Sequence, residues 1–216
     1  QTIKLAGEVV GGLHQRPEFN LPIESNRPDI MAFDPSIWPH GMQANVIAEN
    51  IHPIFSTNFI RRTWLIETQN GAKIEVVLDK GEIAAAGKVE VISELEIELV
   101  EGSRNELFAL ADKLVSQNCI RLGLYSKAAR GYRLADDTPL QPSKSIGFVK
   151  LKGQVTQEQA LIEAMGFGIR FVQKHEQCYF DKPSLKTLKR VTDGISLIRH
   201  NFWLFDDIVS KESTEH

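Results

Sequence analysis

The sequence predicts an α+β protein, with antiparallel β-strands in its first part and α-helices in its last part. Charged and apolar residues alternate along residues 73–102, most clearly where Glu94, Glu96 and Glu98 interleave with aliphatic residues. A period of two is the strand period, so these carboxylates share one face. Beyond residue 145 apolar residues recur every three or four positions, as they do in packed helices.

Turn residues divide the start of the chain. We expect one strand over 2–10 and a second over 14–23, with Pro17 marking an edge or a bulge in the second strand. Residues 24–54 contain four prolines, which is typical of a connection. Within it we expect one short helix, over 45–50.

The middle of the chain predicts a meander. A third strand over 55–67 is followed by Asn70-Gly71, the strongest short signal for a tight hairpin. Gly81 and Gly87 predict a long turn between the fourth strand and the acidic fifth strand. The later elements are an amphipathic helix over 103–117 with a capping box at Ser103 and Glu106, a last strand over 126–134, a helix from the Thr156 cap to about Glu176, and a helix over 185–205.

Composition narrows the class of protein. The 216 residues carry 25 basic and 28 acidic side chains, a net charge of −3, which argues against a nucleic-acid-binding surface. No run of 18 apolar residues is present, so we expect no membrane span. Cys119 and Cys178 form neither a metal motif nor a disulfide framework, which predicts a reducing, cytoplasmic location. The sequence does not identify a protein partner.

The acidic faces have two interpretations from pattern alone. They can be the solvated outer face of a half-buried sheet, which is common. They can also line a polar barrel lumen that holds a metal, because hard divalent cations prefer carboxylate oxygens. Consecutive strands would bring cations and carboxylates to facing positions, as surface ion pairs or as a polyanion site: Lys4, Arg16, Glu18, Arg61, Glu75, Asp79, Glu94, Glu96 and Lys127.

A resemblance favours the lumen. The chain resembles the CYTH family, the triphosphate tunnel metalloenzymes, and more narrowly the bacterial inorganic triphosphatases in which a CYTH domain precedes a helical CHAD domain. The stretches that carry it are KLAGEVVGGLHQRPEFN, FSTNFIRRTW, IEVVLDKGEI, SELEIELVEG and LYSKAARGY. The resemblance implies an eight-stranded antiparallel tunnel that binds triphosphate with Mg²⁺ or Mn²⁺.

The resemblance also implies a division of the chain. Residues 1–135 would be the tunnel domain, 136–145 a linker and 146–216 the first helices of a CHAD-like domain. The family's N-terminal Glu-x-Glu-x-Lys and Arg-x-Arg strands have no counterpart here. We therefore expect an incomplete tunnel, an uncertain activity for the chain alone, and cuts at both ends of the sequence.

The resemblance assigns roles to single residues. Lys4, Arg16, Arg61 and Lys127 would be the catalytic cations that neutralise phosphate oxygens, and Glu18 would join them in substrate binding. Glu94 and Glu96, with Asp79, would hold the metal, whereas Glu98 is a weaker match. Arg62 would point away from the tunnel, and Arg199 is the best match to a polyphosphate-binding residue of the helical part. Ser126, His14 and His40 are expected to be structural or surface residues.

These expectations define a metal-dependent inorganic triphosphatase that hydrolyses tripolyphosphate to pyrophosphate and phosphate. One alternative is a polyphosphate- or nucleotide-binding module without turnover. Another is a different CYTH activity, such as adenylate cyclase or thiamine triphosphatase.

Overall fold

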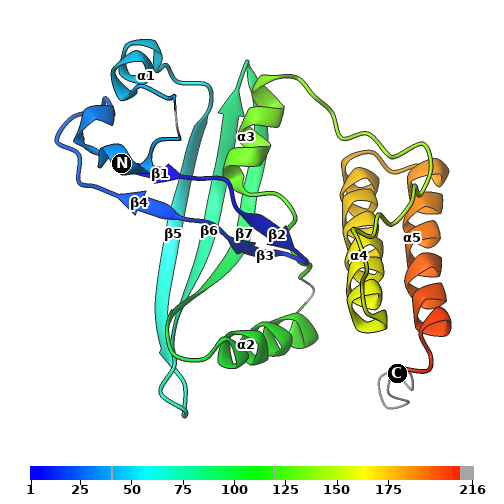
Figure 1. Ribbon diagram of the computed structural model, residues 1–216. Helices are drawn as coiled ribbons and strands as arrows, with labels where there is room; N and C mark the ends of the chain where they lie inside the picture. The colour runs from blue at the N-terminus through cyan, green and yellow to red at the C-terminus, as the bar shows by residue number, and fades with distance from the viewer. Residues whose placement is uncertain (40, 119, 210–216) are drawn as a thin grey trace.

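The computed structural model describes residues 1–39, 41–118 and 120–209 (Figure 1). His40 and Cys119, which entered the sequence predictions, lie outside the described residues. The predicted mixture of antiparallel sheets and C-terminal helices is confirmed. The described strands form one three-stranded and two two-stranded sheets, and they do not close a barrel.

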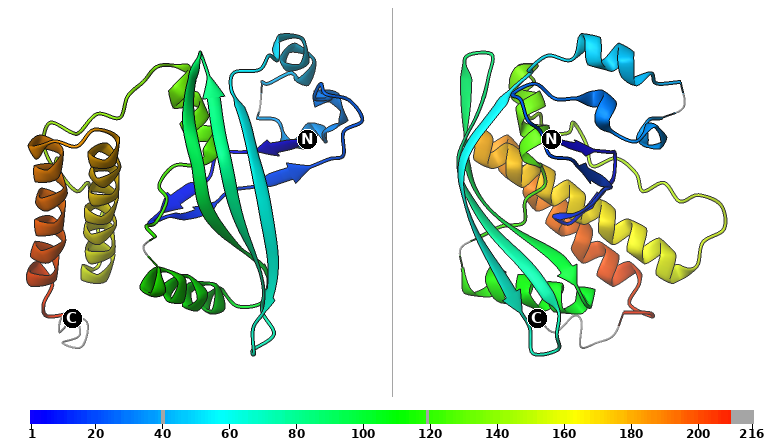
Figure 2. Two further views of the ribbon diagram at one scale, coloured as in Figure 1. Left: turned by 180° about the vertical axis from the view of Figure 1, so that it is seen from behind. Right: turned by 90° about the vertical axis from the view of Figure 1, so that its left-hand side faces the viewer.

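The largest sheet is the predicted meander. It contains β5 (Ser56–Glu67), β6 (Lys73–Ala85) and β7 (Lys88–Glu101), in the order β5-β6-β7 and antiparallel throughout. Its long strands curve, and the other parts of the N-terminal two thirds gather on its concave side (Figure 2). The curvature therefore gives the sheet a sheltered face.

The two hairpin turns differ in how well they were predicted. The turn at Asn70-Gly71 is confirmed, and Gly71 has the positive φ of +80° that favours glycine there. The predicted long turn between β6 and β7 is wrong. Gly81 lies inside β6, and the strands are joined by Ala86 and Gly87 alone, with φ of 49° and 75°. Two positive φ values match a tight two-residue hairpin turn.

The first two predicted strands are each divided. Residues 2–10 contain β1 (Thr2–Lys4) and β2 (Glu8–Val10), and residues 13–20 contain β3 (Leu13–Gln15) and β4 (Glu18–Asn20). β1 pairs with β4 and β2 with β3. The break lies between the pairs Lys4–Glu18 and Glu8–Gln15, next to Pro17, whose carbonyl oxygen accepts a hydrogen bond from the amide of Leu5. A Cβ on Gly7 would lie 2.1 Å from the carbonyl oxygen of Gln15, so the chains approach too closely there for a side chain.

The connection 24–54 is compact. It contains the 3₁₀ helices η1 (Ile30–Ala32) and η2 (Pro35–Ile37) and the predicted short helix, α1 (Ala44–Asn50). Each 3₁₀ helix begins at an aspartate whose side chain accepts a backbone hydrogen bond. Ile30, Phe33 and Ile37 are buried and give this segment a small apolar core.

Helix α2 (Arg104–Gln117) confirms the prediction for 103–117, although its cap differs. Ser103 caps the helix by accepting a hydrogen bond from the amide of Asn105. Glu106 does not complete a capping box but accepts a hydrogen bond from Asn70 in the β5–β6 turn, 2.5 Å away. The helix is thus tied to the end of the hairpin.

The predicted last strand over 126–134 is wrong, because this segment forms helix α3 (Lys127–Ala135). Ser126 caps it, accepting a hydrogen bond from the amide of Ala129. Nine residues are too few for periodicity to separate a strand from a helix, and two alanines favour the helix. Helix α3 lies across the concave side of the sheet and contacts all three of its strands (Figures 1 and 2).

The C-terminal part is a helical hairpin of α4 (Gln157–Asp181) and α5 (Leu185–Leu204). The predicted Thr156–Gln159 capping box is present, while α4 continues past the predicted end to Asp181. Gly168 and Gly194 let the helices approach closely, because a Cβ on Gly168 would lie 2.8 Å from Ile198. No helix among the described residues combines the length and apolarity needed to cross a membrane.

The segment between α3 and α4 is attached to the hairpin. The backbone amide of Ser143 donates to Nε2 of the fully buried His175, 2.9 Å away, and Nδ1 of His175 is 2.7 Å from the carbonyl oxygen of Phe171. Arg190 donates to the carbonyl oxygen of Lys144. This part of the predicted linker therefore packs against α4 and α5.

Candidate functional site

The register of the large sheet aligns three charged residues. Arg61 of β5 is directly opposite Asp79 of β6, and Asp79 is opposite Glu94 of β7. Glu96 lies two residues further along β7 and therefore on the same face. That face is the one covered by α3. Because the strand period is two, the sequence pattern places all four side chains together there.

Asp79, Glu94 and Glu96 form a carboxylate cluster. One oxygen from each lies within 4.8 Å of the others. Asp79 is fully buried, while the side chains of Glu94 and Glu96 are 22% and 50% exposed. Like charges this close need a cation between them. Oxygen donors on a partly open surface suit Mg²⁺ or Mn²⁺, so the residues present fit a hard divalent metal.

Arg61 neutralises one side of this cluster. Its Nε and Nη2 donate to the two oxygens of Asp79 at 2.8 and 2.7 Å, and Nη2 also lies 3.3 Å from Glu96. These hydrogen bonds from Arg61, with a further one from Lys127, hold the pKa of the Asp79 carboxyl below its usual value even though burial opposes this. Asp79 is therefore a carboxylate at neutral pH.

Lys127 neutralises the other side. Its Nζ lies 2.8 Å from Asp79 and 2.9 Å from Glu96, and it also donates to Glu94. Burial lowers the pKa of Lys127, but the hydrogen bonds to the three carboxylates outweigh it and the pKa is raised. One ammonium group thus touches every member of the cluster.

Helix α3 reaches this position because it packs tightly against Phe55, the residue before β5. A Cβ on Gly131 would lie 2.4 Å from the ring of Phe55, and Tyr132 meets the same ring edge-on at 5.1 Å between centroids. Phe59 of β5 follows Phe55 by four residues. The centroid of its ring lies 5.3 Å from Lys127 Nζ and 5.5 Å from the Arg61 guanidinium carbon. Its ring favours both cations.

Two arginines of α3 were missed by the sequence analysis. Arg130 donates to Glu94 at 2.8 Å and to Glu90 at 2.6 Å, and Arg133 donates to Glu90 at 2.6 Å. Both follow Lys127 at intervals of three, the spacing of one helix face. The strand predicted for 126–134 concealed that spacing, because in a strand Arg130 and Lys127 would point to opposite faces.

The other predicted residues lie in a second cluster, on the short strands. Glu18 accepts hydrogen bonds from Lys4 at 2.8 Å and from Arg16 at 3.1 Å. Despite burial, which raises it, these two cations lower the pKa of Glu18. Among the described residues, no hydrogen bond or ion pair joins this cluster to the carboxylates of the large sheet. β1 and β4 nevertheless run across the concave side of that sheet (Figures 1 and 2).

The remaining predicted residues lie elsewhere. Arg62 is opposite Leu78, on the other sheet face from Arg61, as expected. Glu98 is opposite Glu75, further along the sheet than the cluster. Arg199 is exposed on α5 in the helical hairpin.

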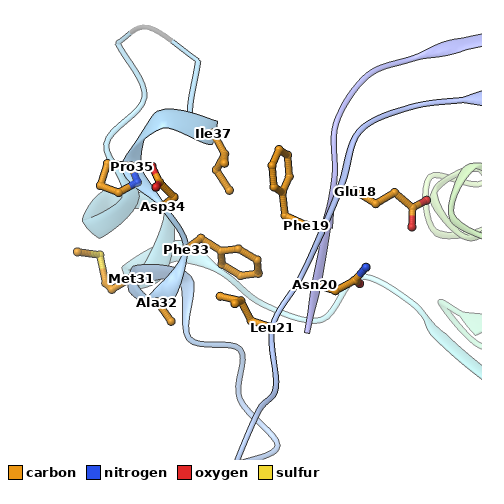
Figure 3. Close-up of a pocket in the computed structure, with 10 residues that line it drawn as sticks. All are labelled: Glu18, Phe19, Asn20, Leu21, Met31, Ala32, Phe33, Asp34, Pro35 and Ile37. Atoms are coloured by element: carbon orange, nitrogen blue, oxygen red, sulfur yellow. The ribbon is translucent and has the colours of Figure 1, made fainter.

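An apolar cavity of about 650 Å³ lies behind the second cluster (Figure 3). Phe19 and Leu21 of the β4 segment face Phe33 and Ile37 across it, whereas Glu18 points away from them. The residues that line it include no lysine or arginine, so it does not suit a polyanion. The short strands therefore turn an apolar face to the 24–54 segment and their charged face away from it.

The fold and the site define a class of protein in which an antiparallel sheet carries a cluster of carboxylates that faces lysine and arginine side chains. The CYTH domain model matches residues 1–132, and the chain belongs to the CYTH family. Over 133 residues it is 40% identical to an inorganic triphosphatase of Haemophilus influenzae. That match covers 62% of this chain and 37% of the relative, so the chain accounts for little more than a third of the relative's length.

Proposed function

We propose that this chain is the triphosphate-handling part of a metal-dependent inorganic triphosphatase, which hydrolyses tripolyphosphate to pyrophosphate and phosphate. The observation that carries the proposal is the cluster of Asp79, Glu94 and Glu96 with Lys127 and Arg61 around it. Family membership and the triphosphatase relative support it. A carboxylate cluster beside cations suits a metal and a polyanion that bind together.

In this proposal the three carboxylates hold Mg²⁺ or Mn²⁺. When bound, such an ion polarises the phosphoryl group and neutralises charge that develops on it. Lys4, Arg16, Arg61 and Lys127 bind phosphate oxygens and align the phosphate chain, and Glu18 orients Lys4 and Arg16 by the hydrogen bonds it accepts. No covalent nucleophile is required.

The charges around the cluster favour a metal that enters with the substrate. With Glu90 the group has four carboxylates, and four cations pair with them, so it is neutral without a metal: Arg61, Lys127, Arg130 and Arg133. A divalent ion entering alone would leave two uncompensated positive charges, and it would replace Lys127 as the counter-ion of the carboxylates. The ammonium group would then be available to a phosphate oxygen. Metal and triphosphate are therefore expected to bind cooperatively.

A second candidate is a module that binds triphosphate or polyphosphate without turnover. The separation of the two charged clusters favours it, because the described strands form separate sheets and not a closed tunnel. The CHAD-like character of 146–216, polyphosphate binding at Arg199 and a cytoplasmic location remain predictions. We propose no role in nucleic-acid binding.

The test is phosphate release from tripolyphosphate with Mg²⁺, with Mn²⁺ and with a chelator. We expect metal-dependent release that falls at least a hundredfold in Glu96→Gln, because a ligand oxygen of the metal is lost. Glu98→Gln is the matched control, since Glu98 lies on the same face of β7 outside the cluster. It should retain most of the activity.

Each other outcome has a clear meaning. Tripolyphosphate binding without phosphate release would favour the binding module. Equal losses in Glu96→Gln and Glu98→Gln would contradict a site centred on this carboxylate cluster.

A further inference from the structure

The side chain of Arg130 has three partners around Glu94. Nη1 donates to Oε2 of Glu94 at 2.8 Å, Nε donates to Oε1 of Glu90 at 2.6 Å, and Nη2 donates to the carbonyl oxygen of Val91. All three partners lie on β7, and the Arg130 side chain is only 15% exposed. A planar guanidinium with three separate acceptors has little freedom to rotate.

The two oxygens of Glu94 have different partners. Arg130 holds Oε2, and Lys127 holds Oε1. The guanidinium is anchored to Glu90 and to the backbone of β7, whereas Lys127 is shared with Asp79 and Glu96. Oε1 therefore faces the position where a metal could replace Lys127, whereas Oε2 is held by Arg130.

We infer that Arg130 is a positioning residue for Glu94, which fixes Oε2 and presents Oε1 alone to the divalent metal. The inference rests on the proposed function, in which Glu94 is a metal ligand. Groups that orient metal ligands typically change metal affinity by 10–100-fold when they are removed. Arg130 would act on the metal through Glu94 and would not touch the substrate.

Arg133 offers a matched control. It is the same residue type on the same helix, and it also binds Glu90, at 2.6 Å, but it makes no hydrogen bond to Glu94. Substituting either arginine removes a contact that holds α3 to β7. Only substitution of Arg130 releases Glu94.

The experiment is a titration of the chain with Mn²⁺, in which free Mn²⁺ is followed by electron paramagnetic resonance. We expect Arg130→Gln to raise the dissociation constant at least tenfold, and Arg133→Gln to change it less than about twofold. Thermal melts of both variants report any loss of folding. Arg130→Lys keeps the charge but reaches fewer acceptors, so it should show an intermediate loss, and it serves if Arg130→Gln does not fold.

A second measurement separates positioning from a purely structural role. If Arg130 acts through the metal ligand, excess Mn²⁺ should restore the phosphate-release rate of Arg130→Gln, whereas a displaced helix would not respond. Unchanged Mn²⁺ affinity in Arg130→Gln, or an equal loss in Arg133→Gln, would overturn the inference. So would the absence of Mn²⁺ binding by the unmodified chain.

The titration also separates this inference from the proposed function. An unmodified chain that binds Mn²⁺ but releases no phosphate would contradict the proposed hydrolysis. The comparison of the two arginine variants would still decide whether Arg130 positions Glu94.

Discussion

The two charged clusters use the same side-chain types in opposite ways. Around Asp79 the acid is fully buried and one lysine, Lys127, meets three carboxylates. Around Glu18 the acid is 36% exposed and meets Lys4 and Arg16, both at least a quarter exposed. One cluster is held by the fold, and the other is held chiefly by its own ion pairs.

The difference indicates a division of work. A metal needs ligands held in place before it arrives, which the sheet register and α3 provide for the Asp79 cluster. A flexible phosphate chain can be bound by cations that adjust, and Lys4 and Arg16 have the exposure to do so. Substitutions should therefore affect stability most at Asp79 and binding most at Lys4.

The largest effect on stability is expected from Asp79→Asn. The change keeps the shape of the side chain but leaves Arg61 and the half-buried Lys127 without their buried counter-charge. Breaking a buried ion pair typically costs about 3–5 kcal/mol, and the partial exposure of Arg61 argues for the lower end of that range. Urea unfolding measures it. Glu98→Gln is the control and should change the free energy of unfolding by less than about 0.5 kcal/mol.

Asp79→Asn also tests the buried cluster through the pH dependence of the free energy of unfolding. The pKa of Asp79 is lower in the folded chain than its ordinary value of 3.8, mainly because of the hydrogen bonds from Arg61. Asp79 therefore stabilises the fold above the unfolded-state pKa, and this contribution is lost as the pH falls through the folded-state pKa. Asp79→Asn should flatten the acid limb of the stability profile. An unchanged acid limb would show that Asp79 is not held as a carboxylate.

A smaller effect is expected where α3 meets Phe55, the residue before β5. In Gly131→Ala the added Cβ would overlap the ring of Phe55, so the helix must move outward or the ring must rotate. Overpacking of this kind costs about 1–3 kcal/mol. The melting temperature should fall, and Phe55→Leu in the same chain should recover part of the loss. If Gly131→Ala melts like the unmodified chain, α3 is not held against Phe55.

The sequence predicted the centre of this site because strand alternation is a strict rule. Once β5, β6 and β7 are paired, Arg61, Asp79, Glu94 and Glu96 must share a face. The sequence analysis listed Lys127 among the facing cations, and its ammonium group does contact the three carboxylates, but the strand assigned to it is wrong. Lys127 comes from a helix, since a short segment with two alanines and an N-cap serine forms one when a sheet lies beneath it.

The remaining differences depend on contacts between segments distant in sequence. The division of the first strands depends on the close approach of Gly7 to Gln15 across the pair, which local patterning does not contain. Arg130 and Arg133 become recognisable only when α3 is placed over Glu90. The separation of the Glu18 cluster from the Asp79 cluster likewise depends on how the short sheets cross the large one.

The smallest effect on stability is expected from Lys4→Met, and it tests the other half of the comparison. The exposed Lys4–Glu18 pair contributes at most about 1 kcal/mol to folding, so urea unfolding should barely change. Tripolyphosphate affinity should fall about tenfold, the loss of one charged hydrogen bond. Lys73→Met is the control, because Lys73 pairs with Glu101 at the same 2.8 Å and with similar exposure, outside both clusters.

The role of Lys4 is decided by comparing the change in stability with the change in tripolyphosphate affinity. A weaker affinity in Lys4→Met with unchanged stability, set against no change in Lys73→Met, would place the phosphate chain across both clusters. Equal affinities in the two variants would confine the substrate to the Asp79 cluster. Lys4, Arg16 and Glu18 would then form a surface network, and triphosphate recognition would depend on Arg61 and Lys127.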